Sequence, residues 1–141
     1  VLEMVTGVKP QRTVGKIQNR DLKVRLGAPI GCKATIRDSE KITQFLTDAF
    51  SCRENVIPSW NFDREGNLSF GVRDYTDFPG QKYDPDIGIY GMDINVVLER
   101  PGHRVSRRRR AKSKVALSHR ITADESREWF KNKFNITILE E

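Results

Sequence analysis

The chain has 141 residues, of which 37% are hydrophobic and 31% are charged, with a net charge of +6 at pH 7. This length and apolar content suffice for the core of one domain, so we expect residues 1–141 to form a single domain. No segment approaches the roughly 20 consecutive apolar residues that a membrane-spanning helix needs, which argues against a membrane anchor.

The N-terminal part is predicted to begin with the end of a helix and to continue into strands. VLEMVTG, residues 1–7, is typical of the last turns of a helix closed by a glycine. Apolar residues then alternate over 22–26 and over 30–36, so we predict two strands that form a hairpin around the turn at 27–29. The hairpin would bury its apolar face. The opposite, uncovered face would present Lys23, Arg25, Lys33, Thr35 and Arg37.

The pattern changes from a period of two to a helical period after residue 38. Apolar residues spaced i, i+3, i+4 and i+7 from Ile42 to Ala49 predict an amphipathic helix, with Asp38 or Ser39 as its N-cap. Residues 51–66 are polar and are broken by proline and glycine, and we assign no element there.

Two further strands are predicted on either side of a long loop. Alternating apolar residues mark one strand over 68–72 and another over 94–98. Between them, TDFPGQKYDPDIGIY, residues 76–90, contains two prolines and two glycines and is predicted to be an ordered surface loop.

The C-terminal part is predicted to be a helix followed by a short strand. Thr122 and Glu125 form a capping box, and Trp129, Phe130 and Phe134 can face the core. NITIL, residues 135–139, fits a final strand. These elements predict an α+β fold: an antiparallel sheet with helices on one face, the other face open, and a long basic loop.

That loop, residues 100–120, contains nine Arg and Lys residues, two His and no acid, whereas the rest of the chain has a net charge of −3. Such a charge needs an anionic partner: nucleic acid, an acidic protein or a membrane surface. A disordered or merely solvated stretch is the alternative. Its place between a strand and a helix favours a functional loop, and seven Arg against two Lys suit bidentate phosphate contact. We hypothesise a phosphate clamp that RNA orders.

The candidate RNA-binding residues combine the uncovered face with the basic loop. An ordinary solvated sheet face is the alternative for the first group. No aromatic residue lies among its outward positions, which favours recognition of the shape and backbone of folded RNA over single-strand stacking. The candidates are Lys23, Arg25, Lys33, Thr35, Arg37, Arg73, Arg104, Arg107, Arg108, Arg109, Arg110, Lys112, Lys114 and Arg120.

An enzyme is the less favoured interpretation, and no cofactor or metal is expected. His103 and His119, together with several aspartates, are the residue types of a metal-dependent nuclease, but their spacing matches no ligand motif. Cys32 and Cys52 are expected to be reduced structural thiols, and Trp60 is expected, with Trp129, to anchor the core or a loop. The aspartates are Asp74, Asp77, Asp84, Asp86 and Asp93.

Five motifs occur along the chain in a fixed order: KPQRT (9–13), APIGCKATIR (28–37), GNLSFGVRDYTDFP (66–79), YDPDIGIYGMDINVVLERPGHRV (83–105) and HRIT (119–122). Together they resemble the large-subunit ribosomal protein L-five family in its archaeal and eukaryotic form. The resemblance covers nearly the whole chain. The basic insertion is also a feature of that branch of the family and is absent from its bacterial members.

The resemblance implies a structural, non-catalytic protein of the cytoplasmic ribosome. Its sheet face would dock on 5S rRNA in the central protuberance through Arg25, Lys33 and Thr35. Further implied partners are large-subunit rRNA, peptidyl-site tRNA, and neighbouring proteins of the central protuberance and of the small-subunit head. The tRNA-contacting loop would hold Thr13, Lys16, Gln18, Asn19 and Arg20. The intersubunit bridge, within residues 79–87, would use Gln81, Lys82, Tyr83 and Asp84.

The chain departs from the family pattern near its N-terminal end. The family begins with a further helix and strand, so the chain is expected to be an N-terminally incomplete member. Val8 replaces a glutamine, Leu22 replaces an aromatic residue, and VGKIQNR is less basic than the usual tRNA-contacting loop. A free-standing RNA-processing enzyme or a regulatory RNA-binding domain remains the alternative function.

Overall fold

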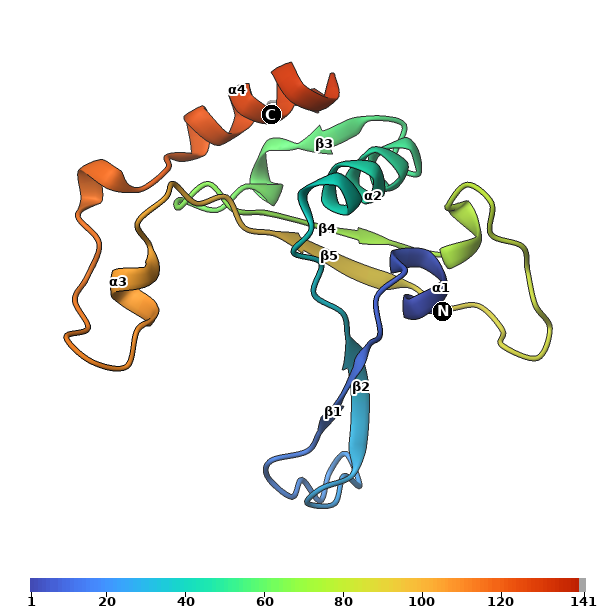
Figure 1. Ribbon diagram of the computed structural model, residues 1–141. Coiled ribbons are helices and arrows are strands. Elements are labelled where there is room, and N and C mark those ends of the chain that lie inside the picture. The colour runs from blue at the N-terminus through green and yellow to red at the C-terminus, as the bar shows by residue number, and fades with distance from the viewer. Residues whose placement is uncertain (140–141) are drawn as a thin grey trace.

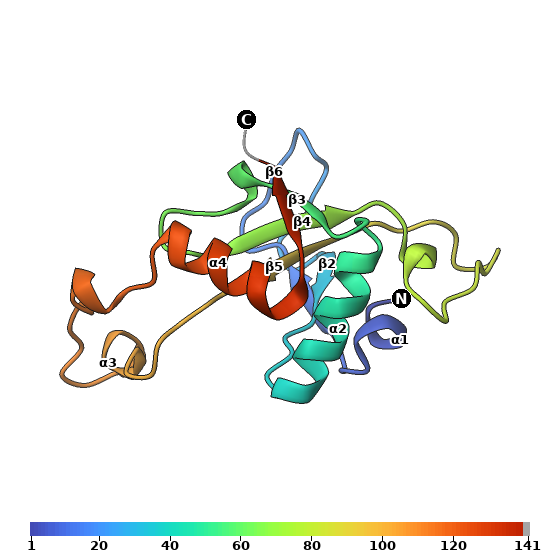
Figure 2. The ribbon, with the colours of Figure 1, turned by 90° about the horizontal axis from the view of Figure 1, so that it is seen from above.

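Two helices cover one face of a two-stranded ribbon. The computed structural model describes residues 1–139. The helices α2 (Ser39–Ser51) and α4 (Ala123–Phe134) lie over the antiparallel pair β4 (Leu68–Val72) and β5 (Met92–Val96), as Figures 1 and 2 show from two directions. The α+β class, both helices and both strands are therefore confirmed.

The core lies between these helices and the ribbon. Strand β4 buries every second side chain, and Phe70 meets Phe50 of α2 with ring centroids 5.4 Å apart. Phe130 of α4 approaches the same Phe50 ring edge-on at 6.0 Å. The apolar side chains that alternate along the strands and those spaced at the helical period thus form one buried cluster. Burial of this apolar surface stabilises the packing of the helices on the ribbon.

A second, parallel strand pair was not predicted. Strand β3 (Val56–Pro58) runs beside β6 (Thr137–Leu139), which buries Ile57 and Ile138. The prediction of β6 is confirmed. Residues 51–66, for which no helix or strand was predicted, contain both β3 and a 3₁₀ turn at Ser59–Asn61. Three residues are too short for a visible period, and here pairing with the distant β6 stabilises the strand.

Local signals at the end of α1 and the start of α4 are confirmed, whereas Asp38, at the N-cap position of α2, makes no side-chain capping hydrogen bond. The short helix α1 (Leu2–Thr6) ends at Gly7, whose φ of 61° is left-handed. The capping box of α4 is complete, because the Thr122 hydroxyl accepts from the backbone N–H of Glu125 and the Glu125 carboxylate accepts from the backbone N–H of Thr122. Such caps satisfy the first orphan donors of a helix, so they can be predicted from nearby sequence.

The predicted hairpin of residues 22–26 with 30–36 is wrong. Strand β2 (Pro29–Lys33) pairs instead with β1 (Gln11–Val14), and residues 15–28 form a looped connection in which Asn19 bridges to Val24. The backbone of Lys23 turns left-handed there, with a φ of 53°, which lies far from the β region that a regular strand requires.

This hairpin and its connection, residues 9–37, project from the body, and we call them the arm (Figure 1). Side chains predicted to be buried lie in solvent: Leu22 is 73% exposed, Leu26 is 71% exposed and Ile30 is 62% exposed. The alternation was real, but in the described residues no layer covers the arm.

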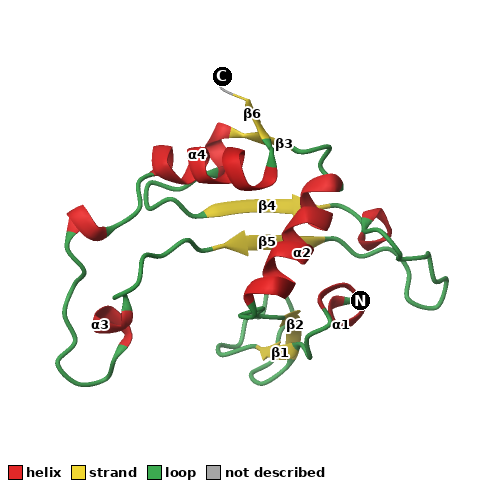
Figure 3. Cartoon of the chain, turned by 45° about the horizontal axis from the view of Figure 1, so that its top comes forward, coloured by secondary structure: helices red, strands yellow, loops and turns green. Residues whose placement is uncertain are grey.

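Long connections leave both ends of the β4–β5 ribbon (Figure 3). At one end, residues 76–90 form the predicted surface loop, preceded by a 3₁₀ turn at Tyr75–Asp77. At the other end, residues 100–120, called the basic segment from here on, contain a single helical turn, α3 (Arg104–Arg107), and a 3₁₀ turn at Leu117–His119. The predicted loop therefore contains short regular elements.

Candidate nucleic-acid interface

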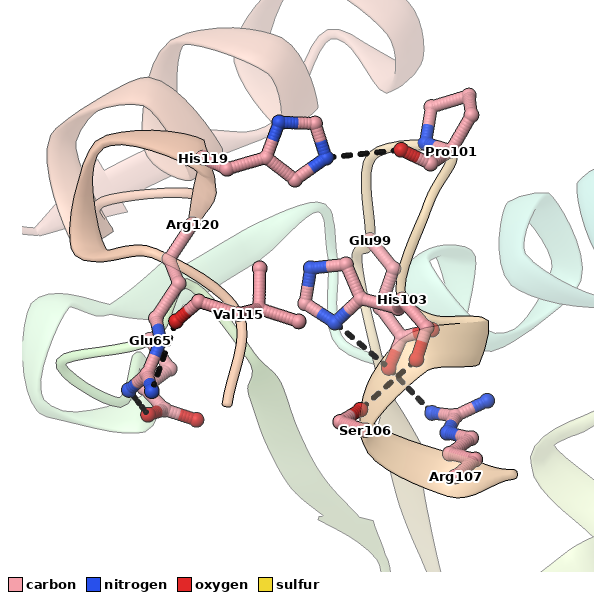
Figure 4. Close-up of polar contacts among 9 residues, drawn as sticks. All are labelled: Glu65, Glu99, Pro101, His103, Ser106, Arg107, Val115, His119 and Arg120. Carbon is pink, nitrogen blue, oxygen red and sulfur yellow. Dashed lines mark hydrogen bonds and ion pairs between the residues drawn. The ribbon is translucent and has the colours of Figure 1, made fainter. Parts of the chain in front are cut away.

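Three ion pairs fasten the basic segment to the body. Arg100 donates from Nη2 to both carboxylate oxygens of Glu125 at 2.9 Å. Arg120 Nη1 lies 2.7 Å from Glu65 Oε1, and Arg107 is paired with Glu99 (Figure 4). The segment contains no acid of its own, so these three arginines are neutralised by acids from outside it.

The two histidines hold the segment's entry and exit together. His119 Nε2 donates to the carbonyl oxygen of Pro101 at 2.8 Å, which joins the two ends of the segment. The His103 ring lies 6.0 Å from the His119 ring, centroid to centroid, and its Nδ1 is 3.8 Å from Glu99 Oε1. The histidines therefore act first as structural groups.

Six basic residues of the segment remain available to a partner. Within residues 1–139 none of the six forms an ion pair. Arg108 donates from Nε to the Ala111 carbonyl at 2.8 Å, which leaves its terminal nitrogens outward. The six are Arg104, Arg108, Arg109, Arg110, Lys112 and Lys114, and all of them are exposed.

The arm is a second concentration of positive charge, and sequence reasoning missed its size. Residues 9–37 contain eight Arg and Lys residues against Asp21 alone, a net charge of +7. Among the described residues, none of the eight forms an ion pair. A count of charge for each part of the chain would have revealed the positive charge of the arm. In the total it is masked by residues 38–99, which have twelve acids and only five bases.

The predicted RNA-binding residues of the arm are all exposed but do not share one strand face. Of these, Lys33 alone lies in a strand, opposite Gln11. Lys23 and Arg25 lie in the connection between β1 and β2, and Thr35 and Arg37 follow β2 on the way to α2. The proposed common sheet face is therefore wrong, whereas the exposure of these side chains is as expected.

The open face of the β4–β5 ribbon is polar and not cationic. Ser69 donates to Asn95 Oδ1 at 2.7 Å across the two strands, and Asp93 is exposed beside them. Arg73 is exposed just beyond the end of β4. Positive charge thus gathers on the arm and the basic segment, away from the ribbon itself.

The residues expected to contact tRNA lie on the arm. Lys16, Gln18, Asn19 and Arg20 are exposed in the connection after β1, while Thr13 is half-buried within β1. Asn19 Oδ1 accepts from the backbone N–H of Leu22 at 3.2 Å, so its side chain shapes the turn.

The residues expected to form an intersubunit bridge lie in the loop at the other end of the ribbon. Lys82 and Tyr83 are exposed, whereas Gln81 and Asp84 are half-buried. The hydroxyl of buried Tyr75 accepts from the backbone N–H of Asp84 at 3.2 Å, which ties this loop to the body.

The acids and thiols considered for catalysis have structural contacts. Asp74 accepts from the backbone N–H of Thr76, and Asp84 accepts from that of Asp86, as turn-forming aspartates do. Across residues 1–139, no group of three His, Cys, Asp or Glu side chains is placed to hold a metal ion.

Cys32 and Cys52 are both free and differ in environment. Cys32 is exposed on the arm, so its expected structural role is wrong. Burial, and next the Asp77 carboxylate, raise the pKa of the half-buried Cys52 thiol, which keeps it protonated and poorly nucleophilic.

The tryptophans also differ. Trp60 is exposed on its 3₁₀ turn, which contradicts its predicted anchoring role. Trp129 packs edge-on against Phe130 at 5.0 Å and carries Lys133 over its ring, so it anchors the outer side of α4.

A family model described as the C-terminus of the ribosomal L-five family matches residues 29–127, which is more than half of the chain. The chain belongs to the ribosomal L-five family. The match runs from β2 to the first half of α4 and includes the whole basic segment. The resemblance carried by the five sequence motifs is therefore confirmed.

Relatives in the ribosomal L-five family include proteins named large ribosomal subunit protein uL5. The protein of Methanosphaera stadtmanae is 44% identical over 138 residues, which is 98% of this chain and 82% of the relative. That of Thermoplasma volcanium is 44% identical over 140 residues, covering 99% and 82%. The protein of Sulfurisphaera tokodaii is 44% identical over 141 residues, covering 99% and 79%.

Among the helices of the described residues, none has the length and hydropathy needed to cross a bilayer.

Proposed function

We propose that this protein is a structural, non-enzymatic constituent of the large subunit of the cytoplasmic ribosome and that it binds 5S rRNA in the central protuberance. The proposal depends on one observation in a chain that belongs to a ribosomal family: its positive charge is concentrated in two regions, the arm and the basic segment. The arm and the basic segment together concentrate cations with no intramolecular partner among the described residues, while the body between them is acidic. RNA supplies the missing anions.

The two positive regions are suited to different contacts. The six available cations of the basic segment lie on a long connection, so they can neutralise phosphates without reading sequence. Arg25, Lys33 and Thr35 lie on the arm, where the bulged β ladder contains Lys33 and the Asn19–Val24 bridge ends next to Arg25, so their spacing is more restricted than in an open connection. A fixed spacing can test the contour of one folded RNA. We assign 5S rRNA discrimination to the arm and general rRNA affinity to the basic segment.

The same proposal extends to the neighbours of the protein on the ribosome. The connection after β1, with Lys16, Gln18 and Arg20 outward, would meet peptidyl-site tRNA. The loop with exposed Lys82 and Tyr83 would bridge to a protein of the small-subunit head. Both regions project beyond the packed body (Figure 1), which fits contacts with bulky partners.

Binding to 5S rRNA under competition tests the proposal. The protein should retain labelled 5S rRNA in the presence of excess unrelated hairpin RNA, and should co-sediment with large subunits in moderate salt. Equal competition by the hairpin would overturn 5S recognition. Cleavage of the RNA that depends on added Mg²⁺ would instead support the RNA-processing alternative.

A further inference from the structure

A hollow of about 410 Å³ lies under the basic segment. Its walls come from the residues just after β5, from α3, from the chain on either side of the 3₁₀ turn at Leu117–His119, and from the turn before β4. Val97, Leu98, Val115 and Ile121 supply apolar walls, and Ser106 and Ser113 add side-chain hydroxyls. Its volume fits one small organic group and excludes a duplex.

The charge in this hollow favours an anionic ligand. Two glutamates line it, but Glu65 is neutralised by Arg120 and Glu99 by Arg107. Lys112 and Lys114 also line it, and neither has an ion pair in the part of the chain that the structure describes. The balance of charge at the walls is therefore positive.

One polar atom in the hollow lacks a partner. The His103 ring turns Nδ1 toward Glu99, while its Nε2 is buried without a hydrogen bond among residues 1–139. Figure 4 shows Nε2 on the side of the ring that faces Val115 and His119. Leaving a buried ring nitrogen unpaired is unfavourable, so a ligand that reaches and bonds it gains affinity.

We propose that this hollow binds one unpaired nucleotide of rRNA, extruded from its stack, and this inference rests on the proposed function. The base lies against Val115 and bonds with its edge to His103 Nε2, which a shift of the surrounding side chains makes accessible. Its phosphate lies on Lys112 and Lys114. Unpaired bases are the part of RNA that proteins bind in this way, by stacking and by edge hydrogen bonds. The basic segment thereby gains a specific contact besides phosphate neutralisation.

Two variants test the hollow from opposite walls. His103→Phe keeps the ring and removes its nitrogens, and Val115→Phe fills the space while keeping every charge. Each should weaken binding to a mixture of 5S and large-subunit rRNA by about tenfold, as for the loss of one buried hydrogen bond. Neither should change the salt dependence, because no phosphate contact is removed. Thermal unfolding of each variant verifies that it folds.

Chemical probing of the RNA identifies the nucleotide. Acylation of 2′-hydroxyls should show one unpaired nucleotide that the unmodified protein protects and that both variants leave reactive. The matched control is Arg109→Gln, on the same segment but outside the hollow. It should lower the salt slope by about 1 and keep that nucleotide protected.

The outcomes separate this inference from the proposed function. If rRNA binds but both folded variants leave affinity and every reactivity unchanged, the hollow is not a nucleotide site and the inference fails alone. If the unmodified protein binds neither rRNA, the proposed function fails. Tight, His103-dependent binding of free nucleoside monophosphates without rRNA binding would also overturn the inference that the bound nucleotide belongs to rRNA. Equally tight binding of inorganic phosphate would overturn the inference that the hollow recognises a base.

Discussion

The arm and the basic segment carry similar positive charge but are held in different ways. The arm spreads its eight cations over residues 9–37, with only Arg12 and Lys33 in the β1–β2 ladder, and none of them forms an ion pair among the described residues. In the basic segment the cations lie close together in the sequence, and three of them form ion pairs with Glu65, Glu99 and Glu125, which lie outside the segment. In the arm, the distance between the cations limits their mutual repulsion. In the basic segment, the three ion pairs with glutamates, which we call the acid clamps, limit it. Charge compensation in the segment therefore depends on acids outside it, whereas the arm has no such compensation among the described residues.

The largest expected effect separates the body from the arm. Phe50→Ala removes a buried ring that contacts three other aromatic rings, and should lower the free energy of unfolding by about 3–5 kcal/mol. Leu22→Ala, at an exposed arm position, should change it by less than about 0.5 kcal/mol. Urea denaturation measures both. A loss of similar size for Leu22→Ala would show that the arm packs against the body in solution.

The second prediction compares the RNA contacts of the two regions. Replacing Arg108, Arg109 and Arg110 with Ala should flatten the dependence of log affinity on log salt by up to about 2.7 units and should weaken 5S rRNA and an unrelated hairpin alike. Replacing Lys23, Arg25 and Lys33 with Ala removes the same charge, but should also abolish the preference for 5S rRNA. Paired salt titrations measure both quantities. Loss of preference in the first variant alone would reverse the assignment of the two regions.

A smaller effect tests the acid clamps. Glu125 serves both the capping box of α4 and the ion pair with Arg100. Glu125→Gln keeps an acceptor for the cap and weakens the ion pair, so it should cost only about 0.2–1 kcal/mol of stability. Thr122→Ala removes the cap and should cost about 1 kcal/mol. Hydrogen exchange should show faster exchange within 100–120 for Glu125→Gln only. Unchanged exchange there would mean that the clamp does not order the segment.

The smallest effect concerns the two thiols. Iodoacetamide near neutral pH should modify exposed Cys32 of the arm before half-buried Cys52, whose pKa is raised by burial and by Asp77. Because the folded state holds the Cys52 proton more tightly than the unfolded state, its contribution to stability is full below the unfolded thiol pKa. It is lost as pH rises through the folded pKa. Cys52→Ala should remove that alkaline decline. Intact-mass spectrometry and denaturation at several pH values measure these outcomes, and faster modification of Cys52 would contradict them.

The sequence by itself determined the elements that a local period or a local cap specifies. Alternation over 68–72 and helical spacing from Ile42 predicted β4 and α2, because burying one face imposes those periods. Thr122 and Glu125 predicted the start of α4, since a capping box involves only neighbours in sequence. The basic segment was equally visible, because its nine cations lie close together in the sequence with no acid among them.

Only the tertiary structure decided which strands pair and which charges are compensated. Residues 22–26 alternate as a strand does, yet they form a turn, because β2 pairs with β1 and no layer covers that part of the arm in the described residues. Likewise, β3 forms because β6, from the far end of the sequence, lies beside it. Glu65 and Glu125 neutralise arginines of the basic segment from distant positions in the sequence. Pairing and electrostatic compensation depend on distances in space, and a linear pattern does not encode those distances.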